Sequence, residues 1–320
     1  MSPRAGLAAA VLVLLAGLSL LVGVGDFRPA DLLIDPGAQL LLSISRLPRT
    51  AAALLTGASM AVAGVIMQVI SRNRFAEPTT VGAAQGAALG LLAVTLLAPA
   101  SPLLWRMGAA TVTALVTTAG FLLVVRRLPP TQPLLVPLVG IVYGGVLGAV
   151  ETFVAYQADL LQYLGTWTNG EFSGVIAGRY EILWISGSAA VIAYVAADRF
   201  TIAALGRDAS LGLGLNYGAM VTLGLVIVAL ITALTVATVG MIPFVGLVVP
   251  NLVSRVMGDN LHRSLPWVAV TGGLLVLGCD IAGRLLRFPY EIPVGTVFGV
   301  LGSGLFLWLL LRDPRGRAAA

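Results

Sequence analysis

The sequence predicts an all-α protein embedded in a membrane, with about ten helices that cross the bilayer. Of its 320 residues, 58% are hydrophobic and only 10% are charged, whereas soluble domains carry roughly 25% charged residues. Apolar runs near the roughly 20 residues needed to cross a bilayer recur along the whole chain. The mean hydropathy of +0.98 agrees with this. No stretch is polar enough to form a soluble domain, so residues 1–320 are expected to form a single transmembrane domain.

Ten apolar runs mark the expected spans. The first follows a single arginine and resembles a signal peptide, but it is longer than the roughly 7–15-residue apolar core of such peptides, so we interpret it as a span. The eighth is short and begins with a proline, which suggests an irregular stretch that is tolerated only where protein buries it. The expected spans are 5–25, 49–71, 80–98, 103–125, 133–157, 180–197, 217–238, 243–257, 266–287 and 292–311.

The distribution of arginine predicts the orientation. All 19 basic residues are arginine, and an inside N-terminus places 12 of them on the cytoplasmic side and seven outside. Because positive charge marks the cytoplasmic side, both termini are expected in the cytoplasm and the protein in the cytoplasmic membrane. The arginines are spread along the chain, which does not suggest a surface for nucleic acid. Arg46, Arg49 and Arg284 lie at outer span ends, where positive charge opposes this topology.

Glycines recur every four residues in three expected spans, so that they share one face of each helix. Small residues at this spacing let membrane helices approach each other closely. Ordinary helix packing explains such faces, and a subunit interface or a translocation path is the alternative that the pattern leaves open. The glycines are Gly82, Gly86 and Gly90 in the third span, Gly140, Gly144 and Gly148 in the fifth, and Gly295 and Gly299 in the tenth.

Two longer stretches interrupt the apolar pattern. The outer loop 158–179 mixes aromatic and turn residues and could carry a short helix. The inner loop 198–216 places Ile202, Leu205 and Leu211 among charged residues, which predicts a short amphipathic helix. Its periodicity fits a helix on the membrane surface and a helix that binds a partner equally well.

Few residues in the sequence are of the types that form catalytic or ligand-binding sites. Glu151 and Asp280 lie well inside expected spans, which makes both candidates for a functional site. Asp280 stands four residues before Arg284, a spacing that favours an ion pair, while Glu151 has no partner nearby and could face a wet cavity or another helix. His262 is expected in a solvated loop, and Cys279 as a small buried residue. No catalytic residue, metal ligand set or bound cofactor is expected.

Four blocks of the sequence stand out: RLPRTAAALLTGASMAVAGVIMQ, RNRFAEPTTVGAAQGAALG, GMIPFVGLVVPNLVSR and EIPVGTVFGVLGSGLFLWLLLR. Together they resemble one family, the permease subunits of binding-protein-dependent ABC importers for iron–siderophores, haem and vitamin B12, the type II importers. The resemblance implies their fold, a second permease copy or paralogue, two ATP-binding cassette subunits with ATP and Mg²⁺, and an extracytoplasmic substrate-binding protein. The chain has no lysine for a phosphate-binding loop, so the ATPase would be a separate polypeptide.

The same resemblance implies roles for individual residues. Arg46, Arg49 and Arg284 would face outward and pair with glutamates of the binding protein; contact with lipid phosphates is the alternative for the first two. The loop 198–216 would contain the coupling helix that rests on the ATPase, and the fifth and tenth spans would line the path at the dimer axis. Coupling would involve Leu205, Gly206, Arg207, Asp208 and Leu211, and the path Gly140, Gly144, Gly148, Glu151, Gly295 and Gly299.

The expected cargo is a ferric siderophore. Many family members have histidine after the proline of the eighth-span block, whereas this chain has Asn251, which is similar to the branch for catecholate and related siderophores. Vitamin B12 or haem remains the alternative within the family. A proton-driven transporter would need a carboxylate relay, for which Glu151 and a paired Asp280 offer little. A structural scaffold would leave the outer arginines unexplained.

Overall fold

The computed structural model describes residues 3–23, 35–79, 82–125, 127–128, 135–258 and 260–311. Across these ranges the regular structure is helical, because a helix satisfies its backbone hydrogen bonds within one segment, as a bilayer demands. Several arginines that were counted for the predicted orientation, on either side of the membrane, lie outside the described residues, as do the first residues of the third and fifth expected spans and the last residues of the first. These arginines are Arg28, Arg126, Arg312, Arg315 and Arg317.

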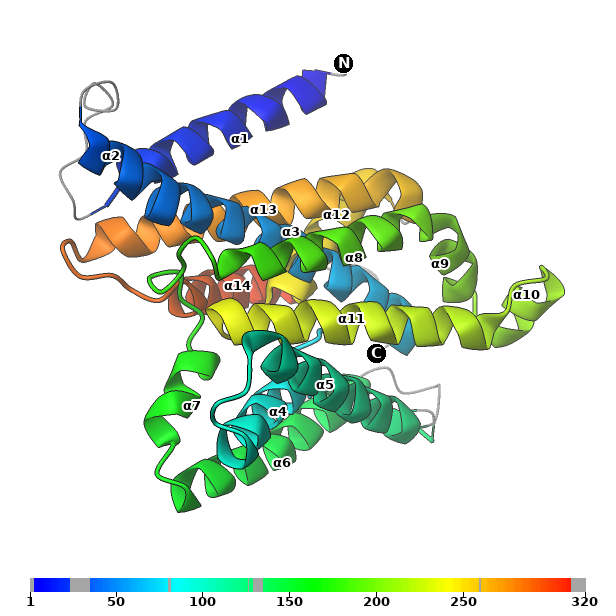
Figure 1. Ribbon diagram of the computed structural model, residues 1–320. Coiled ribbons are helices and arrows are strands. Elements are labelled where there is room, and N and C mark those ends of the chain that lie inside the picture. Colours follow the sequence, from blue (N-terminus) through cyan, green and yellow to red (C-terminus); the bar gives the residue numbers. More distant parts are fainter. Residues whose placement is uncertain are drawn as a thin grey trace.

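Each expected span contains a helix (Figure 1). Among the described residues, five helices are long and apolar enough to cross a membrane, six if the bent pair α8 and α9 counts as one, and four more apolar helices are shorter. The predicted number of ten is therefore not confirmed. The elements are α1 (Pro3–Leu21), α2 (Pro36–Leu41), η2 (Leu42–Arg46), α3 (Leu47–Ser71), α4 (Ala83–Leu97), α5 (Leu103–Val125), α6 (Leu135–Gln157), α7 (Leu161–Thr168), η3 (Tyr180–Ile182), α8 (Leu183–Val195), α9 (Ala197–Ala204), α10 (Arg207–Gly212), α11 (Tyr217–Val239), α12 (Val245–Met257), α13 (Leu261–Leu286) and α14 (Val294–Leu311).

The second span begins much earlier than the sequence predicts. The elements α2, η2 and α3 form one continuous helical segment of 36 residues. The Asp35 carboxylate accepts a hydrogen bond from the Gly37 amide at 2.8 Å, and Pro36 occupies the first helical position. Both features favour a helix start at this point. Arg46 and Arg49 consequently lie inside a long helical segment and not at its N-terminal end.

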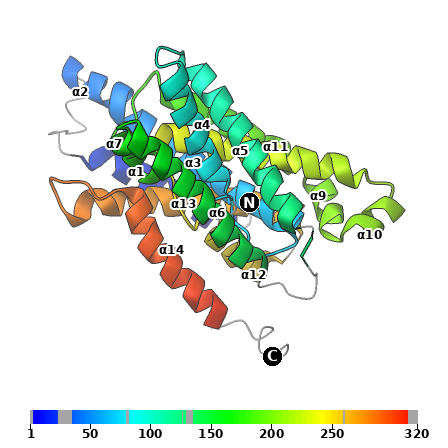
Figure 2. The ribbon, with the colours of Figure 1, turned by 90° about the horizontal axis from the view of Figure 1, so that it is seen from below.

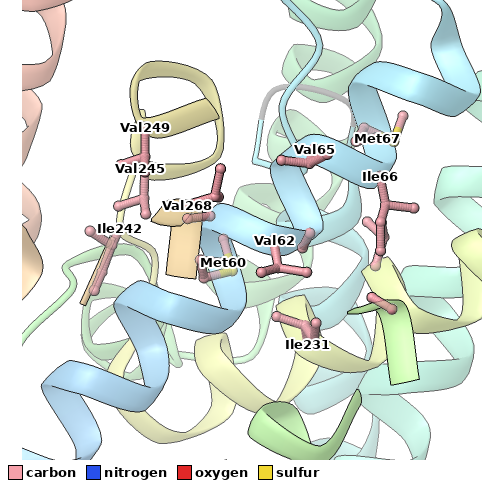
Figure 3. Packing of buried hydrophobic residues seen from close by; sticks show 14 of the residues in the cluster. Met60, Val62, Val65, Ile66, Met67, Ile231, Ile242, Val245, Val249 and Val268 are labelled. Carbon is pink, nitrogen blue, oxygen red and sulfur yellow. The ribbon is translucent and has the colours of Figure 1, made fainter. Parts of the chain in front are cut away.

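The hydrophobic core gathers around α3, which runs through the middle of the bundle (Figures 1 and 2). In Figure 3 the side chains of α3 meet those of α11, α12 and α13. The helices α4, α5 and α6 form a second group beside this core, with α11 between the two (Figure 1). Buried residues of the core shown there are Met60, Val62, Val65, Ile66, Met67, Ile231, Ile242, Val245, Val249 and Val268.

Close approach to α3 depends on glycines. A Cβ atom on Gly57 would overlap the Gly272 carbonyl of α13, and a Cβ atom on Gly64 would overlap the Gly246 carbonyl of α12. Small residues permit this contact between membrane helices. The predicted glycine face of the third span also serves packing, because added Cβ atoms on Gly86 and Gly90 would overlap threonine side chains of α5.

Two segments without regular structure meet beside α12. Residues 72–79 follow α3, and residues 240–244 precede α12. The Gln68 side-chain amide donates to the Gly246 carbonyl at 3.1 Å, and that of Asn251 donates to the Arg74 carbonyl at 2.8 Å. Irregular backbone inside a membrane protein needs such partners. The short α12 and its irregular start confirm the interpretation of the eighth span.

Replacement of Gly64 by alanine should destabilise the fold. The added methyl group would force α3 away from α12, and overpacking of this kind costs roughly 1–3 kcal/mol. Thermal unfolding of the detergent-purified chain would show a lower midpoint for Gly64→Ala. The matched control is Gly108→Ala in α5, where a Cβ atom meets no other atom within 4 Å. Equal losses in the two variants would contradict the role of the close contact.

Candidate functional site

The first candidate site is a cluster of charges where α1, α3 and α13 meet, and we call it the arginine cluster: Arg46, Arg49, Asp280, Arg284 and Glu291. The Arg284 and Asp280 side chains form an ion pair of 2.7 Å within α13, which confirms the pairing expected from their spacing. The second oxygen of the Asp280 carboxylate lies 2.8 Å from Nη2 of Arg49 in α3. One buried carboxylate thus holds two guanidinium groups, and through that of Arg49 it joins α13 to α3.

Two arginines of the cluster hold the end of α1. Nη1 of Arg284 donates to the carbonyl oxygens of Ser19 and Val22 at 3.0 and 2.8 Å. Nη1 of Arg46 donates to the carbonyl oxygens of Leu20 and Leu21. The last carbonyls of a helix lack partners within it, and positive charge is favourable there. The arginines therefore act as a side-chain cap for α1.

This capping changes the expected geometry. The resemblance implies outward-facing arginines, but Arg46 and Arg284 are only 7% and 5% exposed. The reason is the end of α1, whose carbonyl groups draw both guanidinium groups inward. In this structure the two side chains are not accessible to a partner. Their docking role stays a prediction.

Arg49 lies nearer to the surface than the other two. Its Nη1 and Nη2 atoms lie 3.0 and 2.9 Å from the two carboxylate oxygens of Glu291. The side chains of Arg49 and Glu291 are 14% and 29% exposed. Glu291 belongs to the segment that leads from α13 into α14. Sequence reasoning missed it, although it opens one of the four blocks and is an acidic residue next to an expected span.

The second candidate site lies at the opposite end of the chain's long helices. The helix α8 bends by 65° into α9, and α9 is followed by α10, so that both project from the bundle (Figure 1). Gly206 joins them with a φ of 100°, a conformation that side chains other than glycine rarely adopt. The sequence predicts one amphipathic helix in this loop, and the structure contains two short ones.

The surface of this projection is partly apolar. Leu205, Leu211 and Leu213 are all more than half exposed, and Arg207 and Asp208 lie beside them with exposed side chains. Ser210 faces inward, where its hydroxyl donates to the Gly206 carbonyl at 2.7 Å and holds the turn. An apolar patch with charged neighbours at a fixed turn suits contact with another protein.

The third set of predicted residues lies on α6 and α14. Gly140 and Gly144 are buried, and a Cβ atom on Gly148 would meet no atom within 4 Å. Gly295 approaches the backbone of Gly170 and Met241 closely, whereas Gly299 makes only an ordinary contact with Pro243. A path between α6 and α14 would need a second copy and stays a prediction.

Two buried carboxylates stand out beyond the arginine cluster. Glu151 of α6 is buried, and its Oε1 atom has no hydrogen-bond partner among the described residues. Glu77 is completely buried in segment 72–79, close to Thr79 and to the backbone amides of Phe244 and Gly246 at the start of α12. Acidic groups are favourable at a helix N-terminus. The sequence analysis did not single out Glu77, because it lies outside every expected span.

The remaining predicted residues carry no further site. His262 lies in the first turn of α13 and not in a loop, and its Nε2 atom is 3.4 Å from the exposed Tyr194 hydroxyl. Its side chain is about half exposed, so it is solvated as expected. Cys279 is buried, which confirms its interpretation. Within the described ranges, no group of three or more His, Cys, Asp or Glu residues could hold a metal ion.

Comparison with solved structures defines the class of protein. A structure described as an inward-facing conformation of a metal-chelate type ABC transporter matches with a TM-score of 0.81 and 25% identity, over 96% of this chain and 98% of that one. A second structure, PsaBC from Streptococcus pneumoniae in complex with Fab, matches with a TM-score of 0.62 at 13% identity, which shows a common fold alone. The fold is that of an ABC importer permease.

The chain belongs to the FecCD transport family, whose profile matches residues 11–312. It is 45% identical over 304 residues to the petrobactin import system permease protein YclN of Bacillus subtilis, a match that covers 94% of this chain and 96% of that protein. It is 40% identical to the ferric-anguibactin transport system permease protein FatD of Vibrio anguillarum, over 87% and 88% of the two chains. This family consists of permease subunits of ABC transporters, which lack an ATPase site of their own.

Removal of the central carboxylate should strongly destabilise the protein. In Asp280→Asn the buried Arg284 would lose its ion pair, and breaking a buried pair costs about 3–5 kcal/mol. The thermal unfolding midpoint in detergent should fall far more than in Glu291→Gln, since a partly exposed pair contributes only about 0–1 kcal/mol. A larger fall for Glu291→Gln would show that Asp280 does not hold the cluster together.

Proposed function

We propose that this chain is the membrane-spanning subunit of an ATP-driven, binding-protein-dependent importer that moves a ferric siderophore across the cytoplasmic membrane. The similarity over nearly the whole chain to permeases named for petrobactin and anguibactin carries this proposal. Vitamin B12 permeases are less similar, at 35% identity for the one from Salmonella arizonae. A catecholate-type chelate is therefore a better cargo than vitamin B12, and residues 1–320 act as one transmembrane domain.

The proposed assembly contains two permease chains, two ATP-binding cassette subunits that carry ATP and Mg²⁺, and an extracytoplasmic binding protein. The missing lysine supports a separate ATPase, because a phosphate-binding loop needs that residue. The exposed leucines in and beside α10, Leu205, Leu211 and Leu213, support contact with it. In this proposal both termini and the α9–α10 projection are cytoplasmic, and the arginine cluster faces the outside.

We assign direct docking of the binding protein to Arg49. A carboxylate on the partner would replace Glu291, which is the more exposed of the two groups that hold the Arg49 guanidinium. Arg46 and Arg284 would position Arg49 by fixing α1 and Asp280. Exchange of Glu291 would also free the segment before α14, so that docking acts on a helix of the proposed path. Charge pairs at an interface rim mainly set orientation and association rate.

The proposed path runs between α6 and α14 of two permease copies. The glycines of α6 and α14 would let the two permease copies approach closely or leave room for a bulky cargo. Glu151 would be the one acidic side chain that α6 contributes to the wall of the path. The apolar side chains of α6 include Ile141, Val142 and Val146, which are exposed in the single chain. Walls of this kind offer a chelate no fixed ligand, which would favour its release.

Reconstitution with the partner subunits tests the function. Liposomes with this chain, its ATP-binding subunit and its binding protein should take up a ferric catecholate siderophore only when ATP is supplied inside. Parallel liposomes would receive vitamin B12 and haem. Uptake of vitamin B12 or haem in place of the ferric chelate would overturn the cargo, and uptake driven by a pH gradient without ATP would overturn the energy source.

Arg49 and Glu291 should affect docking in opposite directions. Arg49→Gln removes the proposed contact and should slow association of the binding protein, whereas Glu291→Gln removes its competitor and should speed association. Surface plasmon resonance with the reconstituted permease at two salt concentrations would measure both rates, because salt screens such pairs. Glu181→Gln, an exposed acidic residue that accepts a hydrogen bond from Gly178, is the control. Slower association in Glu291→Gln would contradict the exchange.

A further inference from the structure

The helix α1 is fixed to the bundle mainly at one end. Its C-terminal end is held by the guanidinium groups of Arg46 and Arg284, and by a hydrogen bond of 2.8 Å between the hydroxyls of Ser19 and Thr50. Towards its N-terminus α1 diverges from α12 and α13 (Figure 1). A cavity of about 370 Å³ lies between the three helices at this end. We call it the α1 groove.

The lining of the α1 groove is almost entirely apolar. The helix α1 contributes Leu7, Ala8 and Val11, and α12 contributes four apolar residues between positions 252 and 257. The helix α13 contributes Trp267, Thr271 and Leu274, whose polar side-chain groups are the indole N–H of the tryptophan and the hydroxyl of the threonine. A water molecule would find few hydrogen-bond partners on such a surface. In a membrane, the occupant that matches this lining is a hydrocarbon chain.

The N-terminal end of the groove carries a positive charge. Arg263 stands one helical turn before Trp267, on the stripe that continues through Thr271 and Leu274. Its guanidinium group is exposed and has no hydrogen-bond or ion-pair partner among the described residues. The residues that line the groove include no Asp or Glu. An anion at this end would therefore meet an available cation.

The order of residues along α13 matches the order of groups in a phospholipid. Arginine near a membrane surface attracts anionic headgroups, and tryptophan favours the boundary between headgroups and hydrocarbon. The apolar part from Trp267 to Leu274 covers about 10 Å at 1.5 Å per residue. Headgroup, interface and acyl chain would thus meet Arg263, Trp267 and the apolar lining in turn.

We propose that the α1 groove is a binding site for one anionic phospholipid, with its phosphate group at Arg263 and an acyl chain between α1 and the α12–α13 pair. The lipid would fill the space between α1 and the α12–α13 pair, and it would hold the N-terminal end of α1 against the bundle. This site is separate from the arginine cluster, from the α9–α10 projection and from the proposed path. It does not depend on the cargo of the importer.

Native mass spectrometry of the full-length chain would test the acyl-chain part of the site. Detergent-purified protein would be titrated with phosphatidylglycerol, and one tightly held lipid per chain is the expected result. Ala8→Trp fills the groove and should lose this lipid. Ala9→Trp places the same side chain on the exposed opposite face of α1 and should keep it. Equal retention by the two variants would overturn the proposal.

A second pair of variants tests the proposed contact between Arg263 and the lipid phosphate. The wild-type chain should prefer phosphatidylglycerol to phosphatidylcholine, and Arg263→Gln should reduce that preference about fivefold, the effect of one arginine near an anionic surface. Arg199→Gln removes an exposed arginine of α9 and should leave the preference unchanged. Phosphatidylglycerol should also raise the thermal unfolding midpoint of the wild type more than that of Arg263→Gln. Equal binding of both lipids by the wild type would overturn the proposal.

Discussion

The shared carboxylate of Asp280 is the interaction on which the packing of α1, α3 and α13 depends. It lies between the guanidinium groups of Arg49 and Arg284, and Arg284 in turn binds the end of α1. A buried charge is tolerated only with partners and hydrogen bonds that replace water. One acidic group therefore ties α1, α3 and α13 together, and through Arg49 it also reaches the segment before α14.

The second constraint is the central position of α3. Glycines at its contacts with α12 and α13 bring backbones together, and polar side chains link α3 and the irregular segment after it to α12. Gln68, Glu77 and Asn251 belong to this arrangement. Asn251, which the sequence offers as a sign of substrate class, has a structural contact in this chain, since its amide donates to a backbone carbonyl of the segment after α3.

The functional candidates divide between the two ends of this closely packed centre. At one end Arg49 and Glu291 form a partly exposed ion pair, and in the proposed function a carboxylate of the binding protein competes for Arg49. At the other end α9 and α10 present leucines around a turn that glycine makes possible. The continuous helices between them, α3 and α13 above all, connect the two ends directly. An importer that couples docking outside to ATP hydrolysis inside requires such a connection.

The sequence by itself determined the class of protein, the approximate place of each apolar helix and the candidate residues other than Glu291 and Glu77. Composition and apolar length predict a helical membrane protein because a bilayer admits few alternatives, and the spacing of Asp280 and Arg284 predicts their pair because it is local to one helix. Tertiary structure alone decided the capping of α1 by Arg46 and Arg284, the pairing of Arg49 with Glu291, and the burial of Glu77. These contacts join residues that are far apart in the sequence. Which side chains become partners depends on which helix ends meet in space, and helical periodicity carries no information about how helices meet.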